Sequence, residues 1–233
     1  MLAGVGAHGV DGEMKQLIFA ANGAKPRIVL RDAINNVVEI VKNAEYCLIY
    51  DRPLRAEGLT WGELTDWWAQ KTGCDAAEPE TRRKLYRRLR ESLSEQSPPE
   101  RVLFDAYRTR YRSELGGRMP ALLPQVYLHY DPYTIRELAN GPGEPLARQR
   151  MDFLLLLAHS TRIVIEVDGK QHYATGARAS PAKYAAMVRE DRSLRLAGYE
   201  VYRFGASELL SRDGARRADE FFSALLQRHE IES

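Results

Sequence analysis

The sequence predicts a mixed α/β fold (α+β mixed), in which helices pack on a mixed sheet, and two observations predict it. Beyond residue 97, apolar runs of strand length alternate with longer segments of helical periodicity. Two of the apolar runs, residues 150–158 and 161–169, are separated by a very short linker, which predicts an antiparallel hairpin. The order of the segments therefore predicts a mixed sheet flanked by helices.

The first 96 residues predict a smaller α+β domain. Residues 1–16 are rich in glycine and are expected to be loosely ordered. A strand is expected at residues 46–50, where aromatic and β-branched residues gather. Residues 60–73 carry a Thr-x-x-Glu capping box and a terminal glycine, which predict a helix. A second helix is expected at residues 78–95, with leucines along one edge and arginines on its surface.

The run "SEQSPPE" interrupts this pattern and places a domain boundary near residue 96, so that the domains are residues 1–96 and 97–233. In the second domain, Ser97 and Pro98 have the N-cap and first-turn positions of a helix. The elements expected there are helix 97–111, strand 124–131, a turn, short helix and loop at 131–149, strands 150–158 and 161–169, helix 180–198, strand 199–204 and helix 213–230.

Composition describes an ordinary globular protein. The 233 residues are 44% hydrophobic and 28% charged, and the formal net charge of +2 offers nucleic acid no global polycation. Of the 34 basic residues only seven are lysines, and this excess of arginine suits bidentate phosphate contacts or equally reflects genomic base composition. The two cysteines lie far apart in the sequence, which is typical of a protein from a reducing compartment. We find no signal-peptide pattern and no apolar run long enough for a bilayer. These observations indicate a cytoplasmic protein without a membrane partner.

Acidic residues in the predicted hairpin suggest its chemistry. Glu166 and Asp168 share one face of the second strand, because side chains alternate along a strand, and Lys170 joins them unless Gly169 bends the chain away. Antiparallel pairing brings Asp152, near the start of the first strand, close to both acids. Three such carboxylates repel one another unless a hard divalent cation neutralises them, and Mg²⁺ suits oxygen ligands, water and phosphate. A lysine beside the metal could stabilise a phosphoryl transition state.

These residues resemble a known family. Asp152, followed one strand later by Asp168-Gly169-Lys170, is similar to the signature of PD-(D/E)XK nucleases. Over residues 97–210 the order of motifs also resembles the very-short-patch-repair-like branch of small endonucleases. The segments that carry this likeness are Ser97 and Glu100, Gln125, Asp152-Phe153, Glu166 to Gly169 with His172, Asp191-Arg192, and "GYEVYRF" at 198–204.

The resemblance implies a restriction-endonuclease-like core and a Mg²⁺ cofactor that Mn²⁺ can replace. It implies metal ligation by Asp152, Glu166 and Asp168, and further catalytic roles for Lys170, Glu100 and Gln125. Two features depart from the family: Met151 stands where proline is usual, and residues 131–149 form an insertion. The acidic motif can be read as Asp168-x-Lys170 or as Glu166-x-Asp168. We favour Glu166 and Asp152 as the main metal ligands, because Glu166 lies securely inside its strand.

Several of these residues also have simpler explanations. Ser97 and Glu100 fit a capping box, and one carboxylate cannot easily do both jobs. Gln125 could contact the site or merely pair on the sheet edge, and His172 could be a surface histidine rather than a proton carrier or nucleic-acid contact. Arg189, Arg192 and Arg195 recur on one helix face and could grip phosphates or only be solvated. The arginine-rich helix at 78–95 has the same two explanations.

The function we expect is hydrolysis of phosphodiester bonds by a metal-dependent endonuclease, with DNA favoured over RNA and a role in repair or phage defence. The alternative is a non-catalytic nucleic-acid-binding module with a decayed nuclease fold. Under either hypothesis, the first 96 residues could target or regulate the chain, form a homodimer or hold a partner protein.

Overall fold

The computed structural model describes residues 17–23, 27–32, 37–54, 57–95, 97–127, 150–158, 161–176 and 178–231. The predictions for residues 1–16 and 131–149 lie outside these ranges. Six strands form the main sheet, and it is mixed: β7 and β10 are parallel, whereas the other neighbours are antiparallel. In sheet order the strands are β10 (Tyr199–Gly205), β7 (Arg162–Asp168), β6 (Arg150–Leu156), β5 (Leu123–Tyr127), β1 (Leu17–Phe19) and β4 (Leu48–Tyr50).

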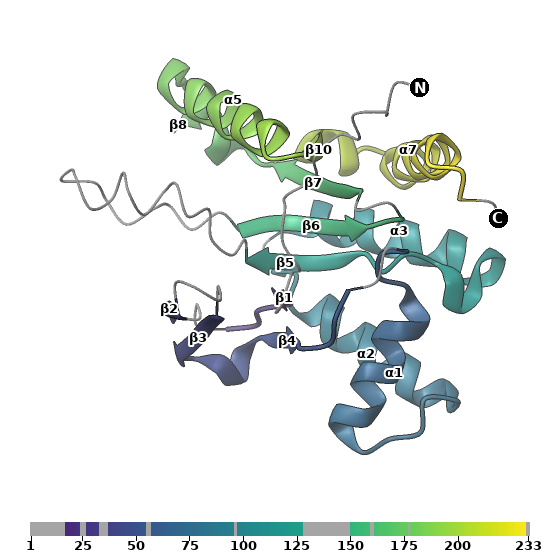
Figure 1. Ribbon diagram of the computed structural model, residues 1–233. Coiled ribbons are helices and arrows are strands. Elements are labelled where there is room, and N and C mark those ends of the chain that lie inside the picture. Colours follow the sequence, from purple (N-terminus) through teal and green to yellow (C-terminus); the bar gives the residue numbers. More distant parts are fainter. Residues whose placement is uncertain are drawn as a thin grey trace, which may run out of the picture.

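Helices flank the sheet, as the sequence predicts. Figure 1 shows α5 and α7 near the β10 end and α1 and α2 near the β4 end. The helices are α1 (Trp61–Thr72), α2 (Pro79–Glu91), α3 (Pro98–Glu114), α5 (Pro181–Leu196), α6 (Ala206–Leu209) and α7 (Gly214–Arg228). Two smaller sheets pair β2 (Arg27–Asp32) with β3 (Val37–Lys42) and β8 (Ala174–Thr175) with β9 (Arg178–Ala179). The mixed α/β class is therefore confirmed, whereas the restriction-endonuclease-like core stays a prediction.

Local sequence signals set the ends of the helices. Thr60 accepts a hydrogen bond from the backbone N–H of Glu63 while the Glu63 carboxylate accepts one from the Thr60 N–H, so the predicted capping box forms. Gly73 ends α1 at a left-handed φ of 68°. At the start of α5, the Ser180 hydroxyl accepts a hydrogen bond from the Lys183 N–H. The second predicted helix ends earlier than expected, at Glu91.

The sheet and its core continue across the predicted boundary near residue 96. β1 pairs with β4 on one side and with β5 on the other, so strands from both predicted domains are neighbours. One hydrophobic core contains Phe19 and Leu85 together with Leu103 and Phe153. The division into two domains, residues 1–96 and 97–233, therefore stays a prediction. In the structure the two segments share one sheet and one hydrophobic core.

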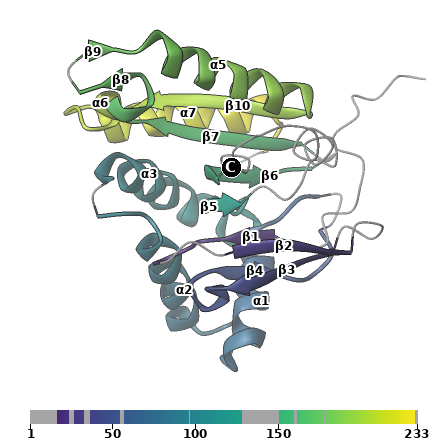
Figure 2. The same cartoon turned by 90° about the vertical axis from the view of Figure 1, so that its left-hand side faces the viewer.

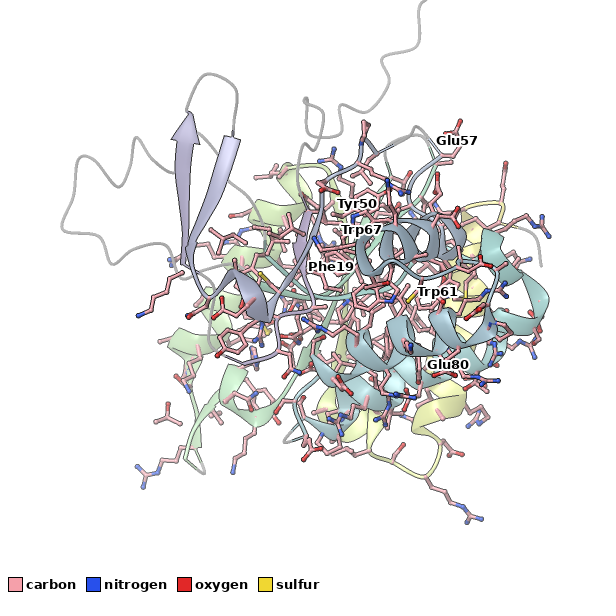
Figure 3. All side chains as sticks on the ribbon, turned by 90° about the horizontal axis from the view of Figure 1, so that it is seen from below. Phe19, Tyr50, Glu57, Trp61, Trp67 and Glu80 are labelled. Carbon is pink, nitrogen blue, oxygen red and sulfur yellow. The ribbon has the colours of Figure 1, made fainter. Side chains whose placement is uncertain are left out.

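Two tryptophans of α1, Trp61 and Trp67, belong to this core, and Trp68 packs against it. Trp67 is 3% exposed, and its ring lies 6.0 Å from Phe19 and 5.5 Å from Tyr50 between centroids. Figure 3 shows these three side chains gathered beside α1. The Trp67 indole N–H also donates to an Asp51 carboxylate oxygen at 3.0 Å, so its polar atom has a partner.

Candidate active site

A polar cavity of about 270 Å³ brings together acids from α3, β6, β7 and α5. Its four carboxylates are Glu100, Asp152, Glu166 and Glu190, and its other lining residues are Tyr127, Arg150, Val167, Gln171, His172 and Arg203. We call this cavity the acidic pocket. Three of the predicted carboxylates, Glu100, Asp152 and Glu166, therefore lie around one space.

Strand register explains why two of these acids meet. β6 and β7 are antiparallel with Phe153 opposite Ile165, and one further step of this register sets Asp152 opposite Glu166. The sequence predicts this proximity from the hairpin. The backbone N–H of Val167 donates to Asp152 Oδ2 at 2.9 Å, which fixes the Asp152 carboxylate against the neighbouring strand.

Gln125 holds an unusual backbone conformation next to Asp152. The β5–β6 register pairs Pro124 with Phe153 and Val126 with Met151, so Gln125 is level with Asp152. Its φ of 52° lies in the left-handed region, which a non-glycine residue rarely adopts inside a strand. Only 2% of the residue is exposed, and its side-chain Nε2 donates to Glu100 Oε2 at 2.8 Å. Gln125 therefore does not line the pocket itself but positions the Glu100 carboxylate that does.

Glu100 both contacts Ser97 at the start of α3 and lines the acidic pocket. The Ser97 hydroxyl donates to Glu100 Oε1 at 2.6 Å, so the helix-start contact is present, and Gln125 occupies Oε2. The same carboxylate lines the acidic pocket. Burial raises the pKa of Glu100, and the negative charge of Asp152 raises it further.

The carboxyls of the pocket make one another harder to ionise. Burial raises the pKa of Asp152, and the Val167 N–H and Arg150 partly oppose this. The pKa of Glu166 is raised well above its ordinary value, first by burial and then by Asp152, while Arg203 lowers it. A bound cation would offset the repulsion among these carboxylates and lower their pKa values.

Asp168 and Lys170 do not line the acidic pocket. Asp168 instead pairs with Arg203, whose Nη1 lies 3.0 Å from Asp168 Oδ1. The alternation of β7 ends there, because after Gly169 the chain turns into the short 3₁₀ helix η3 (Lys170–His172) and Lys170 is exposed. The pocket therefore gathers Glu100 with Asp152 and Glu166, while Asp168 lies beside it and its charge still raises the pKa of Asp152 and Glu166. This placement agrees with the Glu166-centred reading of the motif.

Of the four predicted nucleic-acid contacts, one lines the pocket and three lie outside it. His172 lines the pocket, with 42% of its side chain exposed. Arg189 and Arg192 are exposed on α5 and lie outside the pocket, and Arg195 pairs with Asp191 at 3.0 Å. Their role in binding nucleic acid stays a prediction.

Arg203 is the main residue that the sequence did not single out. It stands beside Glu166 in the parallel β7–β10 register, and its Nε lies 3.1 Å from Asp191 Oδ1. Its Nη2 atom is buried without a hydrogen-bond partner in the described part of the chain. The arginine of "GYEVYRF" was visible as a motif residue, but its placement required the pairing of β10 with β7, which are far apart in sequence.

The donor set suits a metal held by two carboxylates. Among the described residues, no three His, Cys, Asp or Glu side chains are grouped so that they could hold an ion. Both oxygens of Glu100 already accept hydrogen bonds. Asp152 accepts one, from the Val167 N–H, and lies opposite Glu166 in the hairpin register. Mg²⁺ commonly binds proteins through one or two carboxylates and keeps several waters. Asp152 and Glu166 therefore fit such an ion.

Comparisons with protein-family models, with curated proteins and with solved structures found no match. Within the described ranges, no helix has the length and apolar character needed to span a bilayer.

The acidic pocket is expected to make stability depend on pH. Because the pKa of Glu166 is raised on folding, the folded protein retains a proton that the unfolded chain releases near its ordinary value of about 4. Above that pH the folded state binds more protons than the unfolded state, so the free energy of unfolding falls as pH rises through the raised pKa. At about pH 8, Glu166→Gln should therefore have a higher melting temperature than the wild-type protein. The difference should be about 2–4 °C for each kcal/mol gained in the free energy of unfolding.

Calorimetry in a metal chelator measures this difference, which should shrink towards about pH 4. The control is Glu220→Gln, which removes an exposed carboxylate of α7 and should show no such pH-dependent gain. Equal melting temperatures of wild type and Glu166→Gln at both pH values would contradict the electrostatic account.

Proposed function

We propose that this protein is a metal-dependent nuclease that hydrolyses phosphodiester bonds in DNA. The observation that carries the proposal is the acidic pocket, where Asp152 and Glu166 meet across a hairpin and Glu100 is held beside them. Clustered carboxylates with raised pKa values are uncommon away from functional sites. The likeness of the 97–210 motifs to PD-(D/E)XK nucleases, which gives the preference for DNA, supports the same function.

Several residues in and beside the pocket have a definable task in this reaction. Asp152 and Glu166 would hold Mg²⁺, or Mn²⁺ in its place, and when bound the ion lowers the pKa of a water and polarises the phosphate. The Val167 N–H fixes the Asp152 carboxylate, and the Gln125 amide fixes that of Glu100. Arg150 is exposed at the pocket and offers a guanidinium to a phosphate oxygen. In this proposal Arg150 takes the cationic role that the sequence assigned to Lys170.

A second guanidinium lines the pocket. Arg203 pairs with Asp168 and Asp191, and its positive charge lowers the pKa of Glu166. In this proposal the same charge would attract a phosphate to the pocket.

Cleavage assays test the function directly. The purified full chain should be incubated with plasmid, linear duplex, single-stranded DNA and RNA, in Mg²⁺, in Mn²⁺ and in a chelator. We expect cleavage of DNA with either ion and none with the chelator. Metal-dependent cleavage confined to RNA would retain the chemistry and change the substrate. Binding without cleavage under every condition would establish the non-catalytic alternative.

A further inference from the structure

A second cavity, of about 490 Å³, lies between α2 and α3 and is lined largely by arginines. We call it the basic cleft. Figure 2 shows α2 and α3 as neighbours on one side of the molecule. Two glutamates, Glu91 and Glu95, and one aromatic residue, Tyr86, complete the lining. The six arginines are Arg83, Arg87, Arg90, Arg101, Arg108 and Arg112. The lining thus has a clear excess of positive charge.

Some of these arginines are engaged in holding the two helices together. Arg90 Nε lies 3.0 Å and 3.1 Å from the two carboxylate oxygens of Asp105, so α2 is tied to α3. Arg101 donates to the Leu93 carbonyl oxygen at 2.9 Å and 3.2 Å. These contacts give the cleft a fixed shape.

Other cations of the cleft have no carboxylate partner. Arg87 on α2 and Arg112 on α3 are exposed and form no hydrogen bond or ion pair with another described residue. The guanidinium of Arg108 lies 3.6 Å above the Tyr86 ring, which itself stacks on Phe104. Burial lowers the pKa of Arg108, and the nearby charge of Arg112 lowers it further. A negatively charged ligand would relieve this repulsion.

The spacing of the charges indicates a polymeric anion rather than a small one. Arg101, Arg108 and Arg112 line the cleft from α3, and eleven residues of helix span about 16 Å. A single phosphate could contact only one end of such a row. A nucleic-acid strand repeats its charge every few ångströms along its length, so it can meet successive guanidinium groups. Arginine is also well suited to phosphate oxygens, because its planar donors bind them in pairs.

We propose that the basic cleft binds the phosphodiester backbone of a nucleic-acid strand. The acidic pocket and the basic cleft are lined by adjacent residues of α3, Glu100 and Arg101, so one helix contributes to both. This binding does not depend on the proposed cleavage: it is expected even if the acidic pocket is inactive, and it requires no metal.

Fluorescence anisotropy of the full chain in a metal chelator tests the proposal with labelled single-stranded and duplex DNA. The variant is Arg87→Ala with Arg112→Ala, which removes two exposed cations of the cleft. The matched control is Arg82→Ala with Arg217→Ala, which removes two exposed arginines outside the cleft and changes the net charge equally. The cleft variant should bind about tenfold or more weakly, and its log Kd should depend on log salt with a slope smaller by about 2.

The control pair should change Kd by less than about twofold. Replacing Arg87 and Arg112 by lysine should restore most of the affinity, since lysine keeps the charge that phosphates attract. Equal losses in the cleft and control variants would overturn the proposal, as would a cleft variant that binds like wild type. Displacement of labelled DNA by polyglutamate as effectively as by unlabelled DNA would also overturn it and would indicate an acidic protein partner. Unchanged melting temperatures of the variants establish that the comparison concerns folded proteins.

Discussion

Asp152→Asn and Glu166→Gln are each expected to reduce metal-dependent cleavage by at least about 10³-fold, a larger loss than that of one transition-state hydrogen-bond donor. Both substitutions keep the shape of the side chain and remove only its negative charge. Asparagine at position 152 retains an oxygen that can accept from the Val167 N–H, so the link between β6 and β7 survives. The loss would therefore come from weaker metal binding rather than from unfolding. Initial rates of cleavage over a range of Mg²⁺ concentrations, from limiting to high, measure it.

A matched control separates charge at the pocket from charge elsewhere. Glu220→Gln removes a carboxylate that pairs with Arg216 on the surface of α7, away from the acidic pocket, and should cleave at the wild-type rate. Mg²⁺ should raise the melting temperature of the wild-type protein and of Glu220→Gln, because a ligand that binds the folded state stabilises it. It should not do so for Asp152→Asn. Near-wild-type cleavage by both pocket variants would refute the assignment of these residues.

Arg203→Leu is expected to lower the free energy of unfolding by about 3–5 kcal/mol, the usual cost of breaking a buried ion pair from one side. Asp168 and Asp191 both lie against this guanidinium, with 12% and 21% of their side chains exposed. The leucine variant would leave Asp168 without its closest cation and Asp191 with Arg195 alone. Urea denaturation followed by circular dichroism measures the change.

Arg203→Lys serves as the comparison, since it keeps the positive charge but loses the planar fork that reaches both aspartates. It should lie between the wild type and Arg203→Leu. A leucine variant as stable as the wild-type protein would show that the Asp168–Arg203–Asp191 contacts contribute little.

The predictions that succeeded rest on signals close together in the sequence. The Thr60–Glu63 capping box and the hairpin of β6 and β7 depend on a few neighbouring residues. Because the hairpin fixes its own register, the approach of Asp152 to Glu166 could be predicted before the rest of the sheet was known.

The features that the sequence did not predict depend on distant segments. Arg203 reaches Asp168 only because β10 lies parallel to β7, a pairing that joins strands on either side of α5. In this ion pair Asp168 lies beside the acidic pocket rather than in its lining, which strand alternation alone did not predict. The left-handed φ of Gln125 is also invisible in the sequence, because glutamine has no preference for that conformation.

The pairing of β1 with β5 has a practical consequence for studies of the first 96 residues. A chain beginning at residue 97 would lack β1 and would present the open backbone of β5, together with uncovered core residues, to solvent. Unprotected strand edges of this kind recruit other chains and promote aggregation. If such a truncated protein were inactive, the cause would be this self-association rather than the loss of regulation by residues 1–96. Gating by the N-terminal segment is therefore better probed with point substitutions in the intact chain.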